Sequence, residues 1–297
     1  MSVIEIEKLT KYYGKVLALD EVNLNVQKGE VFGFIGPNGA GKTTTLRILM
    51  GLIRKNKGEV ILLGKDPWND AVELHRRLAY VPGDVNLWPN LTGGEVIDML
   101  GKLRGYFEPE RRDELIERFR LDPKKKCGTY STGNRQKVAL IAALVYDVEL
   151  YIFDEPTIGL DPLMELVFRE TVHELKKAGK TVLLSSHILS EVEALCDRVS
   201  IIREGQIIET GTFKELRHLT RTSVFLETNK PITGLENIGG IHNLKLQANQ
   251  AQFSVDSDKI DLILKHITQF QVQSFISKPP TLEELFIRYY GRDNGAN

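Results

Sequence analysis

A glycine-rich stretch near the start of the chain carries residue types suited to binding phosphate. It reads Gly36-Pro37-Asn38-Gly39-Ala40-Gly41-Lys42-Thr43-Thr44 and fits the pattern G-x-x-x-x-G-K-[ST]. Glycines let consecutive backbone N–H groups curl around an anion, and a following helix points the positive end of its dipole at that anion. We therefore expect a nucleoside triphosphate here, with Lys42 at the β- and γ-phosphates and the Thr43 hydroxyl on Mg²⁺.

Two carboxylates end an apolar run that reads Leu150-Tyr151-Ile152-Phe153-Asp154-Glu155. An aspartate at the exit of a buried parallel strand is a holder of Mg²⁺ in phosphate-loop enzymes, which assigns Asp154 to the metal. The adjacent Glu155 could polarise a water for attack on the γ-phosphate, a general-base role. A simple strand exit would also end in this way, but the presence of a phosphate loop in the same chain favours the catalytic interpretation.

Three other places carry residue types suited to ligand contact. Ser131 and Gly133 begin an apolar helix, a second geometry that binds anions, although Ser is also a common helix cap. Tyr13 lies in an expected turn, where its ring could stack on adenine or simply belong to a strand. His187 follows an apolar strand, and open α/β sheets place ligand contacts at the carboxyl ends of their strands.

Strands and helices must position these residues. An apolar run at 31–35 predicts a buried strand before the phosphate loop, and 44–52 predicts an amphipathic helix after it. Period-two alternation predicts a β-rich lobe from two strands at 3–9 and 22–26. Further strands are expected at 58–64, 78–82 and 181–185, and helices at 92–103, 108–120 and 138–145. The first of these helices starts with the capping box Thr92-Gly93-Gly94-Glu95.

Composition limits the class of protein. The 297 residues include 39 Lys+Arg and 40 Asp+Glu, for a net charge of −1, so no nucleic-acid partner is expected. No run approaches the roughly 20 apolar residues of a membrane-spanning helix, and the first residues carry no basic-then-apolar leader. We expect a cytosolic chain. Cys127 and Cys196 are expected to be reduced, structural thiols.

The ordered set of motifs resembles the ATP-binding cassette (ABC) ATPases over residues 2 to 220. The resemblance is closest to the separate ATPase subunits of bacterial exporters for drugs and antibiotics. It rests on the phosphate loop, the helix start at Ser131 and Gly133, and three later segments: Phe153-Asp154-Glu155-Pro156-Thr157, Gly159-Leu160-Asp161 and Ser185-Ser186-His187.

The resemblance implies an α/β fold, a P-loop NTPase cassette over residues 1–220. It would contain a RecA-like core sheet, an N-terminal antiparallel β lobe and a helical subdomain at about 84–145. The segment 221–297 reads as a small α+β domain, with a hairpin about 248–250 and a terminal helix from Pro279 to Phe286. Such appendages suggest a role in dimer stability or regulation, or alternatively in ligand sensing.

The resemblance also implies a role for each site residue. Tyr13 would stack on adenine, residues 36–44 would hold the phosphates and Mg²⁺, and Asp154 would hold the metal through water. Glu155 would activate water and His187 would contact the γ-phosphate. The cofactors implied are ATP and Mg²⁺.

A dimer and a membrane partner are implied as well. In the family, the helix start with Ser131 and Gly133 closes on a nucleotide held by a second subunit, and Asp161 would shape that interface. The pair could be a homodimer or a heterodimer. A separate integral-membrane permease would hold the chain peripherally on the inner face of the membrane.

Two departures from the family pattern stand out. The usual Leu-Ser-Gly-Gly-Gln is Tyr130-Ser131-Thr132-Gly133-Asn134, which keeps the Ser and the second Gly. After Tyr80-Val81-Pro82 the family has a Gln that touches Mg²⁺ and senses the permease, and this chain has Gly83. Mg²⁺ would then rest on Thr43, Asp154, phosphates and water, unless Asp84 reaches in.

Two questions stay open at this stage. The apolar loop residues Val85, Leu87, Trp88 and Leu91 either fold onto their own core or form a partner-binding patch. The chain as a whole is either an exporter ATPase, a soluble cassette acting on ribosomes or DNA, or a regulatory cassette that closes on ATP without turnover.

Overall fold

The structure is a computed structural model that describes residues 1–105, 108–218, 221–256 and 259–278. The chain divides into two compact units, Met1–Thr210 and Gly211–Asn297. The sequence placed this division at residue 220, after the short helix α8 (Phe213–His218), whereas α8 belongs by its contacts to the second unit.

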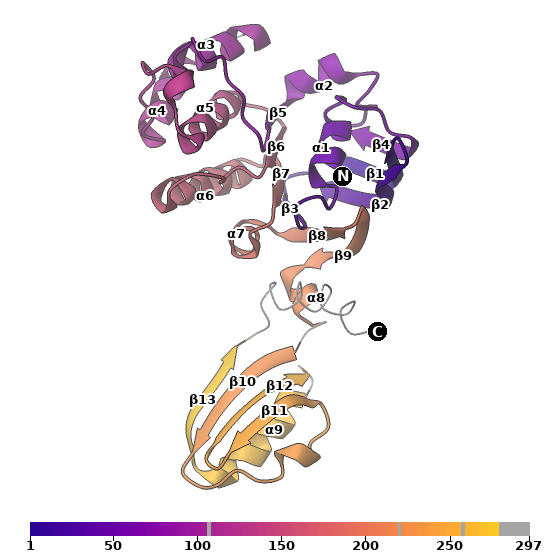
Figure 1. Ribbon diagram of the computed structural model, residues 1–297, viewed down its shortest axis with the longest axis vertical. Coiled ribbons are helices and arrows are strands. Elements are labelled where there is room, and N and C mark those ends of the chain that lie inside the picture. The colour runs from indigo at the N-terminus through magenta and orange to yellow at the C-terminus, as the bar shows by residue number, and fades with distance from the viewer. Residues whose placement is uncertain (106–107, 219–220, 257–258, 279–297) are drawn as a thin grey trace. The chain divides into compact units, whose positions relative to one another are not determined.

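A six-stranded sheet forms the centre of the first unit (Figure 1). Its order is β5 (Leu78–Val81), β6 (Leu150–Asp154), β7 (Thr181–Ser186), β3 (Val31–Ile35), β8 (Arg198–Arg203), β9 (Gln206–Thr212). The first five strands are parallel to one another. Every residue of β3 and β6 is buried, as expected for continuous apolar strands covered on both faces. The predicted α/β cassette core is confirmed.

The register of the sheet brings the ends of distant segments together. Ile35 of β3 pairs with Ser186 of β7, and Asp154 of β6 pairs with Ser185 of the same strand. Because parallel strands share one carboxyl edge, the residues that follow them gather at that edge. The phosphate loop, the two carboxylates and the histidine therefore approach one another across about 150 residues of sequence separation.

The predicted N-terminal β lobe is confirmed as a three-stranded antiparallel sheet. Its order is β2 (Val16–Gln27), β1 (Ser2–Tyr13), β4 (Lys57–Leu62). One core is shared by this lobe, the helix α1 (Lys42–Leu49) and β3. One detail was wrong: Tyr13 is the last residue of β1, paired with Val16, rather than part of the turn.

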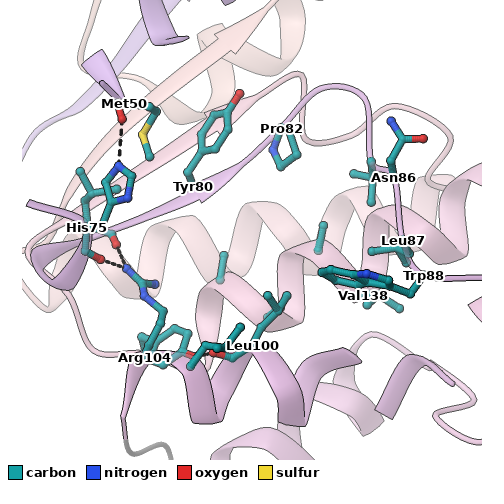
Figure 2. Close-up of a pocket in the computed structure, with 17 residues that line it drawn as sticks. Met50, His75, Tyr80, Pro82, Asn86, Leu87, Trp88, Leu100, Arg104 and Val138 are labelled. Atoms are coloured by element: carbon teal, nitrogen blue, oxygen red, sulfur yellow. Dashed lines mark hydrogen bonds between the residues drawn. The ribbon is translucent and has the colours of Figure 1, made fainter. Parts of the chain in front are cut away.

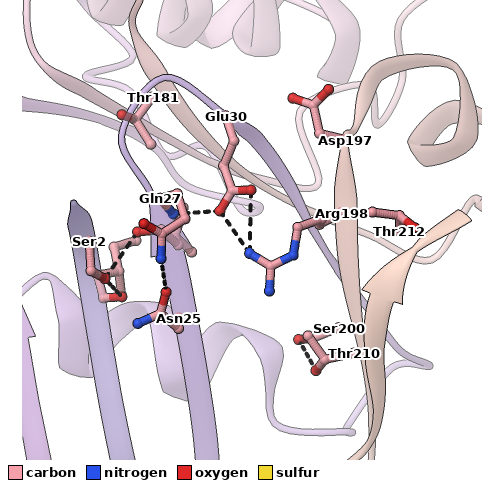
Figure 3. Close-up of polar contacts among 12 residues, drawn as sticks. Ser2, Asn25, Gln27, Glu30, Thr181, Asp197, Arg198, Ser200, Thr210 and Thr212 are labelled. Atoms are coloured by element: carbon pink, nitrogen blue, oxygen red, sulfur yellow. Dashed lines mark hydrogen bonds and ion pairs between the residues drawn. The ribbon is translucent and has the colours of Figure 1, made fainter. Parts of the chain in front are cut away.

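Side chains in and next to the core sheet hold the turn at residues 27–31, which connects β2 of the lobe to β3 (Figure 3). The backbone N–H of Gly29 donates to Thr181 Oγ1 at 3.0 Å, and that of Val31 donates to Asp197 Oδ2 at 3.0 Å. Glu30 accepts from the N–H of Gln27 and pairs with Arg198 at 3.3 Å. These bonds satisfy the polar backbone of a partly buried turn and fix the strand that delivers the phosphate loop.

Three helices lie together, apart from the β lobe (Figure 1). They are α3 (Gly93–Arg104), α4 (Pro109–Arg118) and α5 (Thr132–Leu144). The predicted capping box is present: Thr92 Oγ1 accepts from Glu95 N–H at 3.2 Å, and Glu95 Oε2 accepts from Thr92 N–H at 2.7 Å. Arg104 donates to the carbonyl oxygens of His75 and Leu78 and so joins α3 to the core.

Three further α-helices belong to the first unit. Helix α2 (Ala71–Arg77) precedes β5, α6 (Pro162–Lys177) follows β6, and α7 (Leu189–Leu195) follows β7. Among the helices of the described residues, none is both long and apolar enough to cross a membrane.

The second unit is an α+β domain, as predicted. Its antiparallel sheet has the order β11 (Ile241–Gln247), β12 (Gln250–Asp256), β10 (Arg221–Thr228), β13 (Val272–Lys278). Helix α9 (Ile260–Ile267) covers one face, where Ile263 and Ile267 are buried with Val224 and Phe253. The predicted hairpin about residues 248–250 joins β11 to β12. The terminal helix expected from Pro279 to Phe286 lies outside the described residues.

Candidate functional site

The glycine-rich loop between β3 and α1 has little room for side chains. A Cβ at Gly36 would overlap the carbonyl oxygen of Ile202, and one at Gly41 would lie 2.6 Å from Leu19 Cδ2. Gly41 also has a φ of 111°, a conformation that other residues rarely adopt. The loop therefore packs its backbone against the core and leaves its N–H groups at the start of α1.

Lys42 lies at the centre of this loop and is only 5% exposed. Its ammonium group donates to the carbonyl oxygens of Gly36 at 2.6 Å and Pro37 at 3.2 Å. It also forms an ion pair with Glu155 Oε1 at 3.1 Å. The loop lysine and the second of the two carboxylates are thus in direct contact.

Asp154 is held from both sides. Its Oδ2 accepts from Thr43 Oγ1 at 2.9 Å, and its Oδ1 accepts from Ser185 Oγ. Ser185 also accepts a hydrogen bond from the N–H of Glu155 through its hydroxyl, at 3.2 Å. Thr43 and Asp154 therefore present two hard oxygen atoms side by side, the kind of ligand that Mg²⁺ prefers.

Glu155 lies between two basic side chains. Its Oε2 is 2.7 Å from His187 Nδ1, and its Oε1 faces Lys42. The carboxylate is nearly buried, whereas the His187 side chain is 43% exposed. Glu155 has a φ of 49°, unusual for a residue with a side chain. The strand exit turns sharply here and directs the carboxylate into the site.

Gly83 faces Asp154. A Cβ at this position would lie 3.3 Å from the carbonyl oxygen of Asp154 and 3.6 Å from its Oδ2. A longer side chain at residue 83 would therefore point at the expected metal ligands. Asp84, the alternative ligand, instead accepts a hydrogen bond from Asn86 Nδ2 at 3.2 Å.

Three expected site residues sit at helix starts away from the phosphate loop. Ser131 caps α5 and accepts from the N–H of Asn134 at 3.3 Å. Asp161 caps α6 and accepts from the N–H of Met164 at 3.0 Å. Gly133 packs on the backbone of Gly159, where a Cβ would overlap. Within the described part of the chain, no hydrogen bond joins Ser131 or Asp161 to the loop around Lys42.

Tyr13 also stands apart from the carboxylates. Its ring is 46% exposed at the end of β1, and the Lys11 ammonium lies 5.2 Å from the ring centroid. The exposed face of an aromatic ring is available for stacking.

Two contacts at the site were not predicted from the sequence, although Ser185 belongs to one of the motifs quoted above. Ser185 holds Asp154, and Gln136 of α5 donates to the carbonyl oxygen of Pro156 at 3.0 Å. Parallel pairing of the strands at 150–154 and 181–186 was the signal that could have placed Ser185 beside Asp154. Nothing in the sequence marks Gln136, whose partner is a backbone atom.

A pocket of about 440 Å³ opens beside the site, lined mostly by apolar side chains of β5, α3, α5 and the loop after β5 (Figure 2). Val85, Leu87 and Trp88 line it, and Trp88 is still 51% exposed. Tyr80 lies in the same wall, where burial and the negative charge of Asp154 raise the pKa of its hydroxyl to about 12. The apolar loop thus contributes to a pocket rather than to a closed core.

Comparison with known proteins assigns the family. The model for "ABC transporter" matches residues 19–158. The bacitracin transport ATP-binding protein BcrA of Bacillus licheniformis is 32% identical over 308 residues, which cover 98% of this chain and 98% of that protein. The chain belongs to the ABC transporter ATP-binding proteins. The family predicted from the motif order is therefore confirmed.

Further similarities extend this assignment. The linearmycin resistance ATP-binding protein LnrL of Bacillus subtilis (strain 168) is 32% identical over 98% of this chain and 99% of that protein. A solved ABC cassette, dimeric in a post-hydrolysis state with ADP and phosphate, is 28% identical with a TM-score of 0.63, covering 70% of this chain and 98% of that one. Residues 211–290 match "ATP-binding protein DrrA1-3-like, C-terminal domain".

The loop geometry predicts that Gly36→Ala weakens nucleotide binding by this ABC protein. The new methyl group would displace the loop backbone from Ile202. The strain of about 1–3 kcal/mol corresponds to a loss of about 5- to 150-fold in affinity. Titration with a fluorescent ATP analogue measures the change. Gly239→Ala, which meets no atom within 4 Å, is the control, and equal affinity for both variants would contradict this account of the loop.

Proposed function

We propose that this chain is the ATP-hydrolysing subunit of an ABC exporter and drives transport through a separate membrane permease. One observation carries the proposal: the Glu155 carboxylate lies between Lys42 and His187 at the edge of the sheet that also holds Asp154. Two relatives are named for bacitracin transport and linearmycin resistance, which supports export of antibiotic-like compounds.

Lys42 and the loop N–H groups would bind the phosphates of ATP, with the adenine on the exposed ring of Tyr13. A triphosphate competes with Glu155 for the ammonium group, because both are anions within its reach. As Lys42 turns to the phosphates, Glu155 keeps its contact with His187 and becomes free to accept a proton from an attacking water. The binding of ATP would therefore also release Glu155 from Lys42 and so make it available as the general base.

The fit of Mg²⁺ rests on Thr43 and Asp154, whose oxygen atoms already lie 2.9 Å apart. The described residues contain no group of three His, Cys, Asp or Glu that could hold a metal, so phosphate oxygens and water would complete the shell, as is usual for Mg²⁺. When bound, the ion would neutralise charge on the phosphates.

A head-to-tail dimer would complete each site. Ser131 and Gly133 lie away from their own phosphate loop, and their helix start would close on the nucleotide of a second subunit. Exposed apolar side chains surround the segments expected at that interface: Ile158, Leu163, Leu166 and Ile188. The related solved cassette is dimeric. ATP would shift the population to the closed dimer, and hydrolysis would release it.

The permease would dock in the pocket beside β5, through an apolar helical segment on the cytoplasmic side of the membrane. Trp88 is exposed beside the apolar lining of this pocket, and aromatic side chains that become buried on binding supply much of the energy of protein interfaces. Pro82 lines the pocket, and the next residue, Gly83, lies against Asp154. Strand β5 and the residues after it would therefore contact both the permease and the site of ATP hydrolysis.

The central test is Glu155→Gln. We expect the variant to bind ATP with unchanged or higher affinity and to lose turnover by roughly 10²- to 10⁴-fold, because the amide cannot accept the proton of water. Phosphate release measures turnover, and light scattering with ATP measures the dimer. The exposed Glu170→Gln on α6 is the control.

The result also separates the alternatives. A wild-type chain that turns over no faster than Glu155→Gln, alone or with its permease, would leave a regulatory cassette that closes on ATP without hydrolysis. Recovery of the chain with ribosomes or DNA instead of membranes would favour a soluble cassette.

The pocket generates a second test in Trp88→Ala. We expect the variant to lose membrane association by roughly 30-fold, the effect of removing an aromatic anchor worth about 2 kcal/mol. Co-purification of the chain with detergent-solubilised membranes measures it. Val72→Ala, which removes another exposed apolar side chain outside the pocket, is the control. Full recovery of Trp88→Ala with the membrane would remove the pocket as the docking site.

Gly83 generates a third test. A glutamine there would place an amide against Asp154, so Gly83→Gln is expected to alter coupling to the permease more than nucleotide binding. The measurement is the ratio of transport to ATP hydrolysis in vesicles, beside the ATP dissociation constant. A large change in ATP affinity with coupling untouched would count against this interpretation.

A further inference from the structure

Glu191 is a buried carboxyl group that the proposed reaction does not use. It lies on α7, four residues after His187, and is only 5% exposed. Its Oε2 accepts a hydrogen bond from Ser186 Oγ at 2.9 Å. Its Oε1 is buried and makes no hydrogen bond within the described part of the chain. A carboxyl group in this position needs a reason, because unpaired buried oxygens are unfavourable.

The Ser186 hydroxyl makes two hydrogen bonds, one to Glu191 and one to the residue that follows His187. Ser186 Oγ accepts from the backbone N–H of Ile188 at 3.0 Å while it donates to Glu191. The acceptor at Glu191 orients the hydroxyl hydrogen away from Ile188, which leaves a lone pair for that N–H. Ser186, before His187, is therefore hydrogen-bonded directly to the Glu191 carboxyl group. Ile188, after His187, is linked to the same group through the Ser186 hydroxyl.

His187 has little else to fix its backbone. It lies between the end of β7 at Ser186 and the start of α7 at Leu189, and its side chain is 43% exposed. Its contact with Glu155, at 2.7 Å, depends on the direction in which this short connection leaves the sheet. The connection is held by the hydroxyl and carboxyl groups just described.

The electrostatics agree with this arrangement. Burial raises the pKa of the Glu191 carboxyl, and the nearby Glu165 and Glu155 act in the same direction, against the lowering effect of the Ser186 and Thr157 side chains. A leucine would fill the same space without this cost. A carboxyl group at this position is explained by its orientation of the segment from Ser186 to Ile188.

We propose that Glu191 is a positioning residue for hydrolysis: through Ser186 it fixes the His187 segment so that the imidazole meets Glu155. The inference rests on the proposed ATPase function and adds a residue to it. Glu191 itself touches neither the phosphate loop nor Asp154 in any hydrogen bond of the described residues.

The test compares Glu191→Leu with Glu191→Gln. Leucine removes the acceptor and keeps the volume, so kcat for ATP is expected to fall roughly 10- to 100-fold. KM is expected to stay within about twofold, because most of the expected ATP contacts come from the phosphate loop and Tyr13 rather than from His187. Glutamine keeps an acceptor oxygen for Ser186 and is expected to retain most of the turnover. A general packing role would not produce this split or this rescue.

Ser186→Ala provides the second arm. It removes the other half of the link, so it is expected to lower kcat as Glu191→Leu does, and the double variant is expected to lose no more than either one, since the two act as a unit. Ser190→Ala, exposed on the same helix, is the matched control, and melting temperatures report on folding.

The outcomes separate the two proposals. Normal kcat in both Glu191→Leu and Ser186→Ala, with active wild-type protein, overturns the positioning role alone. Fully additive losses, or equal losses in the leucine and glutamine variants, also overturn it. Wild-type turnover no higher than that of Glu155→Gln defeats the ATPase function itself.

Discussion

The ion pair between Lys42 and Glu155 joins the two halves of the site, and its energetics explain how the site can respond to a ligand. Both side chains are nearly buried. Removing each ion from water costs several kcal/mol, while two unit charges about 4 Å apart attract by about 4 kcal/mol at an effective dielectric constant of about 20. The attraction does not outweigh the cost of desolvating two ions, so the pair contributes little net stability. A phosphate group that replaces Glu155 as the partner of Lys42 therefore meets little opposition.

The parallel sheet is what allows this pair to form. Lys42 follows β3, Glu155 follows β6 and His187 follows β7, and β7 lies between the other two strands. A parallel register fixes all three exits on one edge, and Ser185 of the middle strand holds Asp154 and the backbone of Glu155. The pairing of the strands and the Ser185 hydroxyl thus position the charged groups of Lys42, Asp154 and Glu155.

Sequence patterns predicted the fold because its signals are local. Continuous apolar runs, period-two alternation and the glycine loop specify β3, β6, the β lobe and α1 without knowledge of contacts. The register between strands is a tertiary property, which is why the hydrogen bond between Ser185 and Asp154 was not predicted. Glu191 was passed over for a related reason: a glutamate on a helix is usually solvated, and only the packing of α7 against the sheet buries it.

Gly83 illustrates how one strand can serve two surfaces. Tyr80 of β5 lines the apolar pocket and is close enough to Asp154 for that charge to raise the pKa of its hydroxyl. Three residues later, Gly83 places bare backbone against the same aspartate. Because glycine has no side chain to contact the expected metal ligands, movement in the pocket of the proposed transporter would reach Asp154 through the backbone of β5 and the ring of Tyr80. In that transporter, this strand would make the connection that the resemblance assigns to a glutamine after Tyr80-Val81-Pro82 in the family.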